Sequence, residues 1–157
     1  MTLSIYASIG QMKQTRYNSV ISRLFMKRME IEEAEKALEE IELELSDLKD
    51  AFPEKKKAIY DEYFGKNVHR DAFEKIGYKI MVLEHEISAY KLKIKTQEEN
   101  IDVLKQECQV IEQTKRELAV VLEKYAILVE KDELEQKKIA EYKDDLELEE
   151  FAKPLKN

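Results

Sequence analysis

The chain has 157 residues, the size of one ordinary domain; 39% of them are charged, and the formal net charge is −7. It contains only three glycines and two prolines. Because a sheet or barrel needs many tight connections rich in Gly, Pro and Asn, this scarcity argues against β-structure and Rossmann-like folds. The dominance of Glu, Lys, Leu, Ile and Ala is typical of long helices and coiled coils.

The same counts limit where the protein acts and what it binds. One cysteine, Cys108, cannot close an internal disulfide. The N-terminus lacks a basic start followed by an apolar run, and no apolar stretch approaches the roughly 20 residues that span a bilayer. We therefore expect a cytoplasmic protein with no membrane insertion. The acidic balance argues against nucleic acid as a partner, because phosphate binding needs clustered Lys and Arg.

The first predicted element is a helix over about residues 12–63. Apolar residues recur at alternating spacings of three and four, the heptad pattern that gives a helix one apolar seam. Pro53 removes one backbone donor, but the pattern continues across it, which indicates a kink rather than an end. The seam positions are Tyr17, Val20, Leu24, Lys27, Ile31, Ala34, Leu38, Ile41, Leu45, Leu48, Phe52, Lys55, Ile59 and Glu62.

A turn is predicted over about residues 64–70. Gly65 can adopt the left-handed conformation that ends a helix. Asp71 and Glu74 have the spacing of a capping box, which marks the start of the next helix.

The second helix is predicted over about residues 71–151. Over both helices, 26 of 31 seam positions are apolar, against 43% of the whole chain. The heptad weakens beyond Val129. Its seam positions are Phe73, Ile76, Ile80, Leu83, Ile87, Tyr90, Ile94, Gln97, Ile101, Leu104, Cys108, Ile111, Lys115, Leu118, Leu122, Tyr125 and Val129.

Two long helices joined by a short turn most simply pack antiparallel. The predicted fold is all-α: two long antiparallel helices forming one intramolecular coiled-coil hairpin over residues 1–157. Residues that face each other then have numbers adding to about 135, and no two polar seam residues meet. Because each apolar stripe satisfies the other within one chain, we expect a monomer.

Charge is segregated along the chain. Residues 1–28 carry five basic and no acidic residues, whereas residues 130–150 carry ten acidic and four basic residues. The basic segment can bind phosphates or acidic lipid, form a partner face, or pair with the acidic C-terminal arm. Its candidate partner-binding residues are Arg16, Arg23, Lys27 and Arg28.

Aromatic residues gather around the predicted turn. They are Tyr60, Tyr63, Phe64, Phe73 and Tyr78. One interpretation is a hydrophobic plug that closes the hairpin. The other is a docking tip for another protein, since exposed aromatic patches mark interaction sites. Tyr63, Phe64 and Phe73 are the candidates for docking.

No catalytic or metal-binding pattern is present. The two histidines, His69 and His85, lack the spacing of a ligand pair on one helix face. Cys108 lies on the seam, where a buried structural thiol is expected rather than a nucleophile. We therefore expect no enzyme activity, no metal and no cofactor.

Three patches resemble a known family. They are Lys27-Arg-Met-Glu-Ile-Glu-Glu-Ala-Glu-Lys-Ala-Leu38, the region from Lys66-Asn67 to Phe73-Glu-Lys75, and the ending from Asp132-Glu-Leu-Glu-Gln136 through Glu149-Glu-Phe151. With the unequal helical hairpin, they resemble the central stalk proteins of bacterial type III secretion, the YscO/FliJ family, and most closely the YscO branch. The resemblance places residues 1 to about 19 outside the family pattern.

The resemblance implies a function and partners. Members of the family are similar to the coiled-coil part of the rotary ATP synthase gamma subunit. They insert the open end of the hairpin into the hexameric secretion ATPase, contact the export gate, and in some cases bind substrate chaperones. Phe151 lies in the C-terminal ending that matches the family, so the resemblance adds it to the candidate partner-binding residues.

Two other classes of protein also contain paired helices. A structural tether uses the helices only as a spacer between other components. A prefoldin-like holdase needs β-hairpins between its helices, and the predicted turn is too short to hold them.

Overall fold

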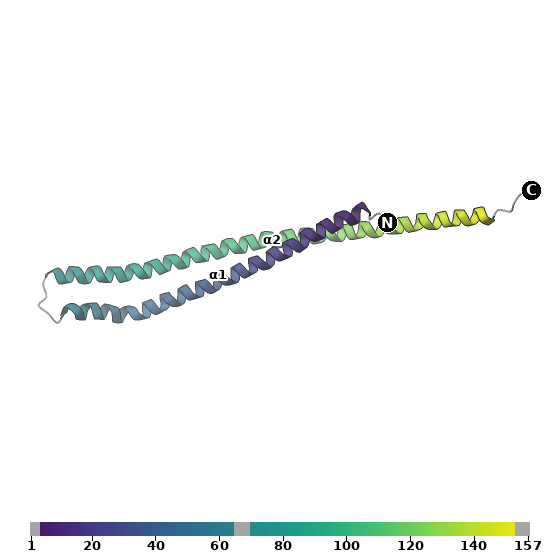
Figure 1. The fold of residues 1–157 in the computed structure, drawn as a ribbon. Coiled ribbons are helices and arrows are strands. Elements are labelled where there is room, and N and C mark those ends of the chain that lie inside the picture. The colour runs from purple at the N-terminus through teal and green to yellow at the C-terminus, as the bar shows by residue number, and fades with distance from the viewer. Residues whose placement is uncertain (1–3, 65–69, 153–157) are drawn as a thin grey trace, which may run out of the picture. The chain divides into compact units, whose positions relative to one another are not determined.

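The computed structural model describes residues 4–64 and 70–152, and these residues form two helices. Helix α1 spans Ile5–Phe64 and helix α2 spans Arg70–Ala152. They run antiparallel and pack on each other as a helical hairpin (Figure 1), which confirms the predicted fold class. The described residues contain no β-strand. The predicted turn, with Gly65 and His69, lies almost entirely outside the described residues.

Helix α1 begins at Ile5, earlier than the expected start near residue 12. The hydroxyl of Ser4 accepts a hydrogen bond from the backbone N–H of Ala7 at 3.1 Å, and the Ser4 carbonyl accepts one from Ser8 at 3.1 Å. A serine in this position satisfies donors that the first turn leaves unpaired. Helix α1 therefore begins before the first heptad position because Ser4 caps it. Helix α1 also runs through Pro53 without ending.

The chain divides into two units, each built from both helices. One consists of Met1–Phe25 and Val110–Asn157, and the other of Met26–Gln109. The buried residues of the first unit are Val20, Leu24, Ile111 and Leu118, and those of the second are Ala34, Leu45, Ile76, Ile101 and Cys108. Every one of these residues occupies a predicted seam position. The core of each unit is therefore the line along which the two apolar stripes meet.

Contacts between α1 and α2 support the predicted register. In the first unit, a Cβ added to Gly10 would lie 3.8 Å from Cβ of Tyr125, and these two residue numbers add to 135. In the second unit, the negative charge of Glu44, which also hydrogen-bonds the Tyr90 hydroxyl, raises the pKa of Tyr90 above its ordinary value. The numbers of Glu44 and Tyr90 add to 134, which is within one of the predicted sum of about 135.

One apolar residue of the predicted seam is not covered. Phe73, the first position of the second series, remains 59% exposed. The residue expected to face it, Glu62, forms an ion pair with Lys79 instead, at 3.0 Å. A carboxylate at this point favours an ammonium partner over a phenyl ring, so the apolar seam begins only at Ile76.

A buried carboxylate in the seam is expected to destabilise the protein strongly. Ile101 is buried, whereas Val103, two residues along α2, is exposed. Replacing Ile101 with Asp places a charge where water is excluded, at a cost of several kcal/mol. We expect Ile101→Asp to lower the melting temperature, followed by circular dichroism, far more than Val103→Asp does. Equal losses at the two positions would contradict the assigned seam.

Removing a glycine from the interior of α2 is expected to stabilise the protein. A Cβ at Gly77 would meet no atom within 4 Å, and no described glycine has a positive φ. Because Gly costs a helix about 0.5–1 kcal/mol relative to Ala, Gly77→Ala should raise the free energy of unfolding by about that amount in urea titration. A loss of stability would show that α2 is not helical at this position in solution.

Candidate partner-binding surfaces

Most of the residues predicted to bind partners lie on the molecular surface. Within residues 4–64 and 70–152, no three or more His, Cys, Asp or Glu side chains are placed to hold a metal ion. Over the same ranges, no helix has the length and apolarity needed to cross a bilayer. His85 is exposed, Cys108 is buried in the seam, and His69 lies outside the described residues. The predicted partner-binding residues fall on three surfaces.

The first surface is the basic part of α1. Arg16 and Arg23, in one unit, and Arg28, in the other, are exposed. A guanidinium group remains charged at any ordinary pH and can form two parallel hydrogen bonds to a carboxylate. These arginines are therefore suited to bind an acidic partner surface.

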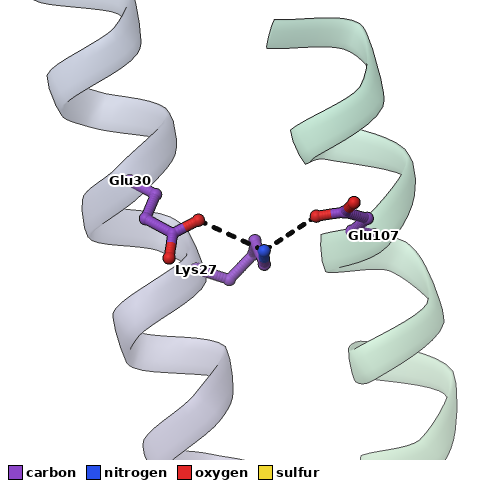
Figure 2. A network of polar contacts seen from close by, with 3 residues as sticks. All are labelled: Lys27, Glu30 and Glu107. Atoms are coloured by element: carbon purple, nitrogen blue, oxygen red, sulfur yellow. Dashed lines mark hydrogen bonds and ion pairs between the residues drawn. The ribbon is translucent and has the colours of Figure 1, made fainter. Parts of the chain in front are cut away.

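Lys27 differs from the three arginines because its side chain is only 19% exposed. Its Nζ lies 2.7 Å from a carboxylate oxygen of Glu107 on α2 and 3.2 Å from one of Glu30, one turn along α1 (Figure 2). The hydrogen bond to Glu107, followed by that to Glu30, raises the pKa of Lys27 above its ordinary value. Lys27 thus joins the two helices.

Further polar contacts join the helices in the same unit. The side-chain amide of Gln97 donates a hydrogen bond to the backbone carbonyl of Ala34 at 3.0 Å. Lys105 forms an ion pair with Glu35 at 3.4 Å. Lys27 and Gln97 are tolerated in the seam because each finds a partner on the other helix. No side-chain nitrogen or oxygen atom is buried unsatisfied among the described residues.

The second surface is the C-terminal arm of α2. Every residue from 133 to 152 is exposed, and Phe151 is 90% exposed. The arm presents apolar side chains among many carboxylates, and these apolar residues are Leu134, Ile139, Tyr142, Leu146, Leu148 and Phe151. A helix with nothing packed on either face is marginally stable by itself. The arm is therefore a candidate for a helix that gains stability by binding a partner.

The third surface lies at the turn end of the hairpin. The rings of Tyr60 and Phe64 stack with centroids 5.6 Å apart, and Phe64 meets Phe73 edge to face at 6.5 Å. Phe64 and Phe73 nevertheless remain more than half exposed. The rings therefore contact one another across the helices and still leave apolar area exposed.

Lys79 is a residue of this surface to which the sequence pattern gave no role. Its Nζ donates to Glu62 at 3.0 Å and lies 5.2 Å from the centroid of the Tyr63 ring. The hydrogen bond to Glu62, followed by one to Tyr63, raises the pKa of Lys79. A groove of about 520 Å³ adjoins this pair, and its walls are Tyr63, Asp71, Glu74, Lys75, Tyr78 and Lys79.

The Lys27 contacts predict a specific dependence of stability on alkaline pH. A lysine whose pKa is raised by folding stabilises the protein below its unfolded pKa, and this contribution disappears as the pH rises through the folded pKa. We expect the melting temperature of the wild type, relative to Lys27→Met, to fall as the pH rises above about 10.5. Glu107→Gln should weaken the same pH dependence. A difference between wild type and Lys27→Met that stays constant from pH 8 to pH 12 would contradict these contacts.

The chain matches the model of a known protein family. The family model described as type III secretion protein YscO matches residues 6–154, nearly the whole chain. No curated protein and no solved structure matches the chain. The N-terminal segment that the resemblance places outside the family pattern lies largely inside this match, which corrects that expectation. A match of this extent agrees with the helical hairpin and with the three sequence patches, and the chain belongs to the YscO family of type III secretion proteins.

Proposed function

We propose that this protein is a non-enzymatic central stalk of a bacterial type III secretion apparatus. It acts in the cytoplasm, at the cytoplasmic face of the apparatus, where it binds the hexameric secretion ATPase and couples it to the export gate. Secretion chaperones are a further class of partner that the family resemblance implies. Membership of the YscO family supports a role in secretion, and the exposed surfaces support the specific contacts.

The observation that carries the ATPase contact is the complete exposure of α2 from residue 133 to residue 152. Helices in proteins are stabilised mainly by tertiary packing, and none of the residues 133–152 is buried against another described residue. A ring-shaped partner supplies packing on all faces of such an arm. The unit that contains the acidic arm also contains the exposed Arg16 and Arg23, so the open end carries both signs of charge. A charged inner wall of the ATPase ring can recognise this pattern.

Coupling requires a second contact, and we assign it to the turn end. Phe64 and Phe73 offer exposed rings next to the Lys79–Glu62 ion pair, so that surface combines apolar area with charge. Protein interfaces are enriched in aromatic anchors of this kind. The hairpin would then link the ATPase at the open end to the export gate at the turn end. A conformational change in the ATPase would reach the export gate through the two helices.

Charge at the open end should control ATPase binding. We expect reversal of Arg16, Arg23 and Arg28 to Glu, or deletion of residues 135–157, to weaken binding to the purified ATPase about tenfold or more and to lower secretion. Binding by the wild type should weaken as salt rises, since the Debye length shrinks from about 8 Å to about 3 Å between 0.15 M and 1 M. Isothermal titration or surface plasmon resonance measures both effects.

The matched control is the turn end. Alanine in place of Tyr63, Phe64 and Phe73 should leave ATPase binding unchanged and reduce binding to the cytoplasmic part of the export gate. Both sets of variants should still melt cooperatively, because they leave the buried seam residues intact. Normal secretion by the open-end variants, together with loss of ATPase binding in the turn-end variants, would reverse the proposed orientation of the stalk.

A further inference from the structure

A second apolar row runs along α2 on the face opposite the seam. In the unit that contains Val110–Asn157, Val120, Ile127 and Leu134 repeat every seven residues and are 67%, 47% and 52% exposed. Residues seven apart lie almost above one another on a helix. The seam of the same segment faces the other way, and its Leu118 is buried. The row borders a groove of about 350 Å³, lined by Val120, Glu123, Lys124, Ile127, Leu128 and Lys131.

Charged side chains flank this outer row in an ordered way. Each apolar residue is followed four positions later by a lysine, which gives the exposed column Lys124, Lys131 and Lys138. Glu123 and Glu130, which are also exposed, stand three positions after Val120 and Ile127. The corresponding position after Leu134 is Lys137. On a helix, residues at +3 and +4 lie on opposite sides of the line joining positions i and i+7. The row therefore has a lysine column on one side and glutamates on the other.

This arrangement matches one kind of occupant, an amphipathic helix. Apolar residues at heptad spacing pack against a partner helix with the same spacing, and flanking charges select its identity and direction. The complementary helix carries carboxylates on the side that meets the lysine column and ammonium groups on the side that meets Glu123 and Glu130. A helix with flanking charges of a single sign satisfies one column and is repelled by the other.

Two other occupants fit less well. A second copy in antiparallel two-fold pairing would set the lysine columns against each other. In parallel pairing the glutamates of one copy meet lysines of the other, but Lys137 at the third layer then faces the lysine column of the other copy. An anionic membrane is disfavoured by residues 130–150, which carry ten acidic and four basic residues next to the row.

We propose that the outer row Val120–Ile127–Leu134 is a docking surface for an amphipathic α-helix of another protein, with acidic residues along one flank and basic residues along the other. This surface uses none of the arginines on which the proposed ATPase contact depends, and it overlaps the C-terminal arm at Leu134. It rests on the exposure and order of the side chains, so it does not require the proposed function.

Designed helical peptides test the proposal with the full-length protein. The probe is a fluorescent peptide of about 21 residues, or three heptads, with leucines on one face, Glu along one flank and Lys along the other. The comparison peptide has Lys along both flanks. We expect the mixed-flank peptide to bind the wild type more tightly in fluorescence anisotropy. Ile127→Asp should weaken this binding about tenfold or more. Leu92→Asp, at a leucine elsewhere on α2 that is 65% exposed, should not.

A charge variant gives an independent result. Lys124→Glu combined with Lys131→Glu makes both flanks of the row acidic, so this protein should prefer the peptide with Lys on both flanks. All variants lie outside the seam, and unchanged melting curves verify that they fold. Absence of binding, equal binding of both peptides, or no effect of Ile127→Asp would overturn the proposal. So would a wild-type dimer in sedimentation that Ile127→Asp abolishes, or Ile127-dependent binding to vesicles of phosphatidylserine and phosphatidylcholine but not to the peptide.

Discussion

Neither helix of this protein can bury its apolar stripe alone, and the packing of one stripe on the other is the contact on which the whole structure depends. All nine buried side chains of the described residues lie on this seam. A fully buried aliphatic side chain contributes about 1.5–3 kcal/mol, so a line of such residues can hold two long helices together without any other core. The remaining side chains are left at least partly exposed, which explains how a chain of this size presents several surfaces at once.

Polar residues within the seam give it direction and register. A purely apolar heptad seam can slide by seven residues at little cost, because the same pattern recurs. Lys27 opposes this slide, since a shift of one heptad would replace Glu107 by Asn100 or Thr114 and leave the ammonium group without its carboxylate on α2. The hydrogen bond from Gln97 to the Ala34 carbonyl also opposes this slide. These contacts cost some apolar burial and in return select one antiparallel pairing.

The exposed surfaces differ in what they offer a partner. The arm at the C-terminal end of α2 offers a whole unpaired helix, the turn end offers stacked aromatic rings with an adjacent ion pair, and the outer row offers a narrow apolar line between charged columns. The proposed stalk function needs separate surfaces of this kind, one for each proposed partner. The turn end lies on a different segment from the arm and the outer row, which share Leu134, so binding at the turn end need not block binding at the other two.

The sequence by itself determined the helical class, the seam and the break between the helices. Heptad spacing is a local property of each helix, so it can be counted directly, and every buried residue falls on a counted position. Only the tertiary structure decided what individual side chains do across the two helices. It engaged Lys27 with Glu107 while leaving Arg16 and Arg23 exposed, although all belong to one basic segment. It also left Phe73 uncovered, because Glu62 pairs with Lys79. Such outcomes depend on which long side chains meet in space, and a one-dimensional pattern does not encode the reach of those side chains.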